Sequence, residues 1–220
     1  MKKYLYLLLL VFFGSSLIAQ QNEAFRQTAP EGGPLPQLQW EEAQQFTLKN
    51  GLQVILVEDH QVPRLTVQLF IDRPPILEGD AAGYVGITGD LLSRGTSSRS
   101  KLEIDQAVDF IGANLSSSAN GVFGSSLTRH RETLLTIMSD VLLNPAFPEE
   151  EFEKVKRQIR SGLLQAQKDP SSIASRVMDQ LCYGKDHPYG ENTTLETLDN
   201  ITLEQCQEFY QTYFTPDKAY

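Results

Sequence analysis

The side chains best suited to bind a metal or move a proton near neutral pH are three histidines, His60, His130 and His187. No two of them are three or four residues apart, the spacing that puts two imidazoles on one face of a helix. His60 follows two acidic residues, and His130 lies between two arginines, which disfavours a bound cation. We therefore interpret all three as surface or loop histidines.

Carboxylates are the next candidates, because four of them crowd residues 149–153: Glu149, Glu150, Glu151 and Glu153. Pro148 precedes them and predicts the start of a helix, where acidic side chains favour the helix dipole. A metal-binding role for the cluster is the alternative. Serines are plentiful, but no serine–histidine–carboxylate set can be recognised, which argues against a serine hydrolase.

The chain has two cysteines, Cys182 and Cys206. Neither belongs to a C-x-x-C motif, so thiol redox catalysis is disfavoured. In an oxidising compartment the two are candidates for a disulfide with each other. The alternative is two buried free thiols, because the sequence does not fix the distance between them.

Residues 1–20 have the pattern of a secretory signal peptide. Lys2 and Lys3 precede an apolar run over residues 4–13, and Ala19 is a small residue at a suitable cleavage point. The run is too short to span a membrane. We therefore expect an exported chain, periplasmic or extracellular, with a flexible leader over residues 21–39 that is rich in glutamine, proline and glycine. The net charge of −9 argues against nucleic-acid binding, which needs a basic face.

Strands are expected on both sides of two tight turns. Asn50-Gly51 lies between apolar stretches at 46–48 and 52–57, which predicts a β-hairpin. Apolar and polar residues alternate over 64–71, which predicts a third strand. A second hairpin is expected over 115–127, with strands at 115–118 and 122–127, and a last strand, truncated, from Ala219.

Helical patterns fill most of the remaining sequence. Asp80 is the candidate cap for a helix that starts at Gly83, and Ser100 with Glu103 predicts a capping box. Two further helices are expected over 133–143 and 148–167. Two more are expected to begin at Asp169 and at Thr202. Strands, then helices, a hairpin and more helices predict one α+β domain over residues 40–220, with a mainly antiparallel sheet packed against helices.

Five stretches carry recognisable motifs: 48–57, 83–96, 147–156, 187–190 and 213–217. Taken in order, they resemble the insulinase (pitrilysin) family of zinc peptidases, which includes the mitochondrial processing peptidase. The resemblance runs from Phe46 to Tyr220. It implies the metallohydrolase-like, insulinase-type N-terminal domain, incomplete at its C-terminal end.

Active members of this family carry an H-x-x-E-H motif on a helix and a distal glutamate on a later helix. The resemblance places the two histidine positions at Gly86 and Asp90, the base position at Gly89 and the distal ligand at Glu153. Glycine has no donor atom, and Asp90 offers oxygen alone. We therefore expect no catalytic residue, no zinc on this chain and no peptidase activity from the chain alone.

The resemblance implies a non-catalytic subunit of a heterodimer. Such a subunit helps an active chain, which carries the zinc, to bind and enclose peptide substrates. The alternatives are an exported binding or scaffold module without a peptidase partner, and an enzyme with a displaced site. Gly83, Gly86 and Gly89 lie on one side of the expected helix, which predicts either close approach of another backbone or drift after loss of the metal.

Overall fold

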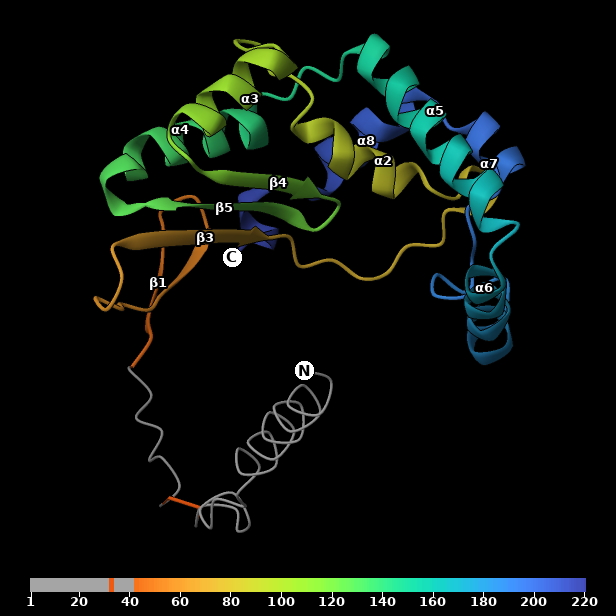
Figure 1. Ribbon diagram of the computed structural model, residues 1–220, viewed down its shortest axis with the longest axis horizontal. Coiled ribbons are helices and arrows are strands. Elements are labelled where there is room, and N and C mark those ends of the chain that lie inside the picture. The colour runs from red at the N-terminus through yellow and green to blue at the C-terminus, as the bar shows by residue number, and fades with distance from the viewer. Residues whose placement is uncertain (1–31, 34–41) are drawn as a thin grey trace, which may run out of the picture. The chain divides into compact units, whose positions relative to one another are not determined.

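The computed structural model describes residues 32–33 and 42–220 of the chain (Figure 1). The expected signal peptide, most of the expected leader and Trp40 lie outside the described residues, so these assignments stay predictions. Among the helices that are described, none combines the length and the apolarity that crossing a bilayer requires.

The described strands form two antiparallel sheets. β1 (Gln44–Thr47) pairs with β2 (Gln53–Leu56). β3 (Arg64–Phe70), β5 (Gly121–Leu127) and β4 (Asn114–Ser118) form a second sheet with the order β3-β5-β4. Both predicted hairpins and the predicted third strand are therefore confirmed.

The first hairpin turns where the sequence predicts it. Gly51 has a φ of 91°, a conformation that glycine adopts without steric cost. The amide of Leu48 donates to the carbonyl of Leu52 at 2.8 Å and closes the turn. This turn sets the register that pairs Phe46 with Val54.

The last two residues connect the two sheets. The amide of Gln53 in β2 donates to the carbonyl of Ala219 at 3.4 Å. Phe70 of β3 and Tyr220 exchange two backbone hydrogen bonds, of 2.7 and 3.0 Å, and Ile71 forms an antiparallel bridge with Ala219. Where the sequence predicts the onset of a strand, Ala219 thus forms an isolated antiparallel bridge with the residue that follows β3.

Helices occupy most of the remaining described chain. They are α2 (Tyr84–Leu92), α3 (Lys101–Phe110), α4 (Arg131–Leu143), α5 (Glu149–Ala166), α6 (Pro170–Tyr183), α7 (Leu195–Asn200) and α8 (Leu203–Tyr213). Short 3-10 turns cover Gly79–Ala81, Thr128–His130 and Pro216–Lys218. The sequence predicts all of these α-helices except α7.

Side-chain caps fix where several of these helices begin. The predicted capping box of Ser100 and Glu103 is present at α3, and Thr202 with Gln205 forms another at α8. Asp169 accepts a hydrogen bond from the amide of Ser172 at 2.8 Å and caps α6. Such caps satisfy amides that have no partner inside the helix.

The core lies between the β3-β5-β4 sheet and the helices. Leu134, Ile137, Met138 and Val141 of α4 are buried, and α4 packs on β5. Gly124 of β5 permits this approach, because a Cβ there would lie 2.3 Å from the sulfur of Met138. α2 is buried between α8, β4 and α5. The α+β fold class is therefore confirmed.

Candidate functional site at helix α2

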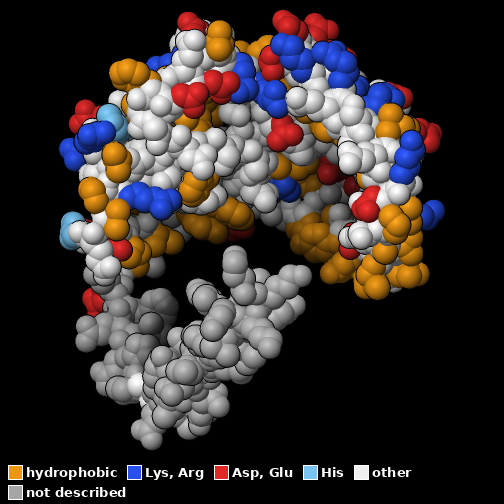
Figure 2. Space-filling model, viewed as in Figure 1, with side chains coloured by type: hydrophobic (Ala, Val, Ile, Leu, Met, Phe, Trp, Pro, Cys, Tyr) orange, Lys and Arg blue, Asp and Glu red, His pale blue; other side chains and the backbone are white. Residues whose placement is uncertain are grey.

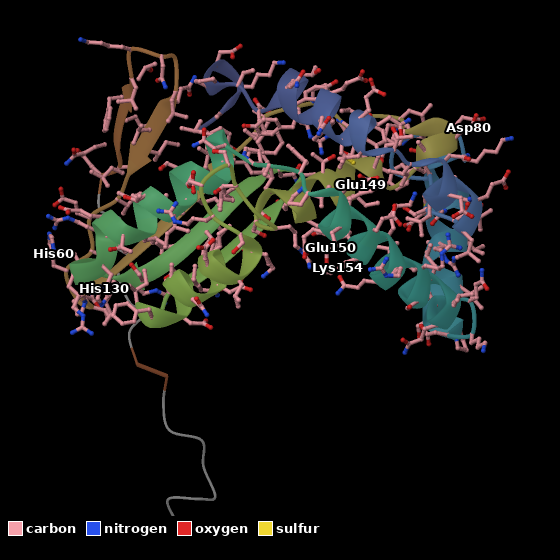
Figure 3. All side chains as sticks on the ribbon, turned by 90° about the horizontal axis from the view of Figure 1, so that it is seen from above. His60, Asp80, His130, Glu149, Glu150 and Lys154 are labelled. Atoms are coloured by element: carbon pink, nitrogen blue, oxygen red, sulfur yellow. The ribbon has the colours of Figure 1, made fainter. Side chains whose placement is uncertain are left out.

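Glu78 caps the helix on which the sequence places the degenerate motif. Its Oε2 accepts hydrogen bonds from the amides of Gly83 at 2.9 Å and Val85 at 3.0 Å. The prediction that Asp80 caps this helix is wrong. Asp80 lies in the preceding 3-10 turn and is exposed (Figure 3), while the chain bends back through Gly83, whose φ is 114°.

Glu191 holds the capping segment in place. Its two carboxylate oxygens accept hydrogen bonds from the amides of Glu78 at 2.7 Å and Gly79 at 2.5 Å. Burial raises the pKa of Glu78, and the nearby Glu191 carboxylate acts in the same direction. The two hydrogen bonds to the backbone amides of Gly83 and Val85 oppose the rise. The loop that carries the His-Pro-Tyr-Gly motif, which Glu191 follows, therefore positions the start of α2.

The two positions that the motif match assigns to histidines face open space. Gly86 is exposed, and a Cβ built on it would meet nothing within 4 Å. Asp90 lines a polar cavity of about 320 Å³ with Ser93, Arg94, Lys101 and residues 115–117 of β4. Partial burial raises the pKa of Asp90, and the Arg94 guanidinium opposes that rise. The cavity therefore holds a single carboxylate from α2.

Backbone occupies the space next to Gly89, the position that the motif match assigns to the general base. Gly89 is buried, and a Cβ there would lie 2.0 Å from the nitrogen of Ala119 and 2.2 Å from the carbonyl carbon of Ser118. The turn between β4 and β5 thus rests directly on the helix. The predicted close approach of a backbone is confirmed at this glycine, and the backbone comes from the chain's own hairpin.

Glu153 lies on the wrong face of α5 to act as the distal ligand. The buried side of α5 carries Phe152 and Val155, and Glu151 and Gln158 accept hydrogen bonds of 3.4 Å from Arg94, which follows α2. Glu153 is two residues beyond Glu151, roughly 200° around the helix axis, and it is exposed. The assignment of Glu153 to a position beside Asp90 is therefore wrong, because the match of motif letters did not fix the phase of the helix.

The acidic cluster instead stabilises the start of α5. Glu149, Glu150 and Glu151 occupy its first turn, and Lys154 forms ion pairs with Glu150 and Glu151 at 2.8 Å each (Figure 3). Hydrogen bonding to Lys154 lowers the pKa of Glu151. This arrangement agrees with the helix-dipole interpretation of the cluster.

None of the three histidines lies on α2. His60 contacts Glu58 at 3.4 Å, and in Figure 3 both His60 and His130 lie at the opposite end of the view from Asp80. His187 stacks on Tyr183 with ring centroids 5.4 Å apart. Among the described residues, no three histidine, cysteine, aspartate or glutamate side chains are grouped so that they would hold a metal ion.

The candidate disulfide does not form in this structure. Cys206 on α8 is fully buried, and its sulfur lies 3.8 Å from the carbonyl oxygen of Tyr84. Cys182 on α6 is exposed, and both thiols are free. The alternative of two buried thiols holds for Cys206 alone, because Cys182 is exposed.

Comparisons with known proteins identify the fold and the relatives. No family model matches the chain. It is 22% identical over 181 residues to the uncharacterized zinc protease YmxG of Bacillus subtilis, and 24% identical over 176 residues to the alpha subunit of the mitochondrial-processing peptidase of Solanum tuberosum. The chain is similar in sequence to bacterial zinc proteases and to a mitochondrial-processing peptidase subunit. The alignments include 79% and 77% of this chain.

Two solved structures have the same fold. An inactive domain of a peptidase M16 from Pseudomonas fluorescens superposes with a TM-score of 0.73 at 24% identity, over 81% of this chain. A protease from Helicobacter pylori superposes with a TM-score of 0.71 at 19% identity, also over 81%. The chain spans 44% and 34% of the two curated relatives and 45% of each solved chain.

The residues on α2 do not fit the zinc that this fold carries in active peptidases. Gly86 has no donor atom, and Asp90 is a single carboxylate in a cavity whose other charged groups are Arg94 and Lys101. Catalytic zinc usually takes three protein ligands. These residues therefore do not form a catalytic zinc site. What the site offers is a polar cavity next to strand β4.

Proposed function

We propose that this chain is a non-catalytic, exported homologue of insulinase-type peptidases. It binds extended peptide segments beside α2 and helps an active zinc peptidase chain to hold its substrates. The proposal rests on the close contact of the Ser118–Ala119 backbone with Gly89. This contact leaves no room for a side chain at position 89, where the family's motif has its general base.

The non-catalytic part is tested with the purified chain. We expect well under one zinc per chain by elemental analysis, and no cleavage of unfolded protein substrates with or without added Zn²⁺. Cleavage that a chelator abolishes, together with stoichiometric zinc, would instead support an enzyme with a displaced site.

Strand β4 supports peptide binding. It pairs with β5 on one side, and within the described residues no backbone hydrogen bond reaches its other edge. Ser118 and Gly121 flank a two-residue turn and form a hydrogen-bonded pair. Because hydrogen-bonded pairs alternate along an antiparallel ladder, the amides of Ser117 and Leu115 point away from β5. An extended peptide can add to such an edge through main-chain hydrogen bonds. The adjoining Asp90 cavity would receive its side chains.

A proline substitution tests this edge. Ser117→Pro removes an outward amide without removing a bond to β5, so it should weaken peptide binding while the sheet persists. Ser117→Ala is the matched control, because it also loses the 2.9 Å hydrogen bond to Ser93 but keeps the amide. Binding of a random decapeptide pool is read by hydrogen exchange along β4. Equal peptide binding by the two variants would contradict a role of the β4 edge in binding.

An exposed apolar surface on α6 supports a partner chain. Ile173, Val177, Met178 and Leu181 are 42%, 50%, 59% and 77% exposed, and apolar side chains gather at the lower right of Figure 2. Contiguous apolar surface of this kind marks interaction sites. One relative is itself a peptidase subunit, and one structural neighbour is an inactive domain.

Pull-down from the exported fraction of the native source distinguishes the two candidate roles. We expect to recover a zinc peptidase with an intact H-x-x-E-H motif, and we expect Leu181→Glu to weaken that recovery. Recovery of an unrelated envelope protein in its place would favour the scaffold role.

A further inference from the structure

Asp90 is the charged group of the polar cavity at α2 whose charge is not matched by an ion pair. The two cations that line the cavity are both engaged. Arg94 pairs with Glu151 at 3.4 Å, and Lys101 pairs with Asp105 at 2.5 Å. Neither of these two carboxylates lines the cavity. Asp90 is exposed, and the described residues offer its side chain no hydrogen bond and no ion pair.

The position of Asp90 in its helix also favours a cation. It lies in the last turn of α2, and that turn contains no basic residue. The carbonyl end of a helix carries a partial negative charge, so the Asp90 carboxylate adds to a field that is already negative. An anion would meet this field and would have to displace the partners of Arg94 and Lys101. The cavity is therefore suited to a positively charged group.

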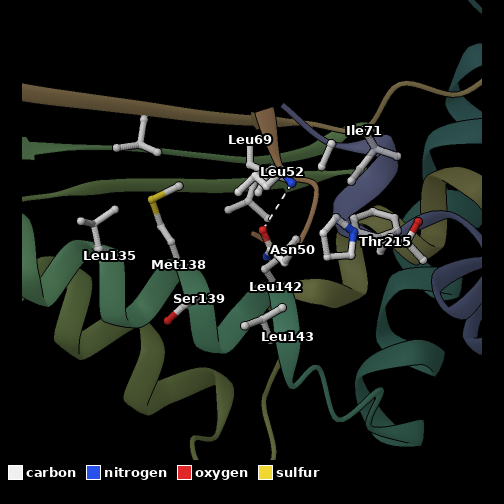
Figure 4. Close-up of a pocket in the computed structure, with 15 residues that line it drawn as sticks. Asn50, Leu52, Leu69, Ile71, Leu135, Met138, Ser139, Leu142, Leu143 and Thr215 are labelled. Carbon is white, nitrogen blue, oxygen red and sulfur yellow. Dashed lines mark hydrogen bonds between the residues drawn. The ribbon is translucent and has the colours of Figure 1, made fainter. Parts of the chain in front are cut away.

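The apolar cavity between β3 and α4 has no such preference (Figure 4). Its volume is about 340 Å³, and none of the residues that line it is charged. A basic group that entered it would lose water without gaining a partner, which is costly. A preference for cationic ligands would therefore report on the Asp90 cavity.

One side of α2 lies along the edge of β4. Ser117 of β4 donates a hydrogen bond of 2.9 Å to Ser93, which follows Asp90 by three residues and shares its side of the helix. Gly86, one turn before Asp90, has no side chain, and a Cβ there would meet nothing within 4 Å. Space for an inserted side chain thus lies next to the Asp90 carboxylate, between α2 and β4.

A peptide on the β4 edge would direct alternate side chains into this space. Residues opposite one another in paired strands lie on the same face of the sheet. The peptide residue opposite Ser117 therefore points as Ser117 does, towards Ser93 and Asp90. Asp90 belongs to the helix layer, so a short side chain from the sheet would not reach it. Lysine and arginine carry their charge at the end of a long stem.

We propose that Asp90 selects peptides with a lysine or arginine side chain at the position opposite Ser117. This selection rests on the proposed function, since it needs a peptide on the β4 edge. It adds the chemical class of the ligand, an extended segment with a basic residue on the helix side of the sheet. The position that the motif match assigns to a zinc-binding histidine thus binds a cation that the peptide itself supplies.

The probe is a short peptide of alternating threonine and glutamine with blocked ends and one variable residue at a central threonine position. Lysine, norleucine and glutamate are placed there in turn. We expect the lysine peptide to bind roughly fivefold tighter than the norleucine peptide by fluorescence anisotropy, and the glutamate peptide to bind most weakly. Hydrogen exchange at the amides of Leu115 and Ser117 should slow when the lysine peptide binds.

Two aspartates provide matched variants. Asp90→Asn removes the charge with little change of shape, so the lysine and norleucine peptides should then bind with equal affinity. Asp109→Asn removes the same charge from an exposed position on α3 that does not line the cavity, and it should keep the preference for lysine. This second variant controls for the change in net charge of the chain.

The outcomes separate this selection from the proposed function. Equal binding of the three peptides with protection at β4 would overturn the selection by Asp90 and leave the proposed function standing. A preference for glutamate, or a preference for lysine that survives Asp90→Asn, would overturn the selection as well. No binding of any peptide at about 1 mM, or protection at β3 in place of β4, would overturn both.

Discussion

The backbone nitrogen of Ala119 lies 2.0 Å from the point that a Cβ on residue 89 would occupy. Only glycine, which has no Cβ, avoids this clash. The two positions are 30 residues apart in sequence and are brought together because the β4–β5 turn folds over α2. Real Cβ atoms do not approach backbone as closely as 2.0 Å. The helix and the hairpin therefore specify glycine at this one position of the motif.

The first prediction compares two glycines of the same helix. Gly89→Ala should lower the free energy of unfolding by about 1–3 kcal/mol, because the turn must move. Gly86→Ala should raise it by roughly 0.5–1 kcal/mol, because position 86 is open and alanine favours the helix. Urea unfolding of the two variants measures both effects. Equal stability of Gly89→Ala and the parent would contradict the packing described here.

The second prediction concerns zinc. Gly86→His combined with Asp90→His puts two imidazoles four residues apart on the exposed side of α2. We expect this variant to bind Zn²⁺ with a dissociation constant on the order of micromolar or weaker, since it supplies two protein ligands where catalytic sites use three. It should still not cleave peptides, because the base is absent. Calorimetry with Gly86→His alone is the control, and peptide hydrolysis by the double variant would contradict this view of Gly89.

The third prediction concerns the cap at Glu78. Glu78→Ala removes the acceptor for two amides of α2 and should cost about 1 kcal/mol of stability. Glu78→Gln keeps an acceptor oxygen but removes the buried charge. It should therefore be at least as stable as the parent at pH 7.

The pH dependence of this cap has a defined sign. Burial raises the pKa of Glu78 in the folded state, so the folded chain holds the proton more tightly than the unfolded chain. Its contribution to stability is therefore present below the ordinary pKa of 4.5 and declines as pH rises through the folded value. From pH 4 to pH 7, the free energy of unfolding of Glu78→Gln should rise relative to that of the parent. If it fell relative to the parent with rising pH, the folded state would favour the charged carboxylate.

The fourth prediction concerns Asp140, which ties α4 to the loop after α2. Thr96 and Ser98 donate to its carboxylate at 2.8 and 2.7 Å, and Arg99 pairs with it. Burial acts to raise the pKa of Asp140, but these hydrogen bonds and one from Asn144 outweigh it and hold the pKa below its usual range. Asp140→Asn should cost about 1–3 kcal/mol at pH 7.

The loss of stability caused by Asp140→Asn should vanish at low pH. A lowered pKa means that the stabilisation by Asp140 is present above the ordinary value of 3.8 and is lost as pH falls through the folded value. The difference in unfolding free energy between the parent and Asp140→Asn should therefore shrink between pH 5 and pH 2 (roughly the range over which paired carboxylates titrate). A constant difference would show that packing, not charge, accounts for the cost.

Features with local causes were predictable from the sequence. The Asn50-Gly51 turn and the capping boxes that begin at Ser100 and Thr202 depend on residues within a few positions of one another. Their side chains and backbone conformations suffice to place the start of an element. The fold class followed from the order of such elements along the chain, whereas the division of the strands into two sheets did not.

Features that depend on distant contacts were not predictable. Glu78 caps α2 because Glu191, far along the chain, holds its backbone. Glu153 matched a motif by letter, but its face of α5 is set by how Arg94 meets Glu151 and Gln158. The contact of the β4–β5 turn with Gly89 likewise requires the tertiary structure, although the unusual glycine content of the helix pointed to it.

The contact at Gly89 also restricts which sequences can be reached from this one. A glutamate cannot enter the helix until the turn has withdrawn, and a withdrawn turn leaves an unfilled gap over the glycine. Each change is harmful without the other, so a path of single substitutions to a glutamate at position 89 passes through a less stable intermediate. A lineage that keeps this packing therefore keeps glycine at position 89.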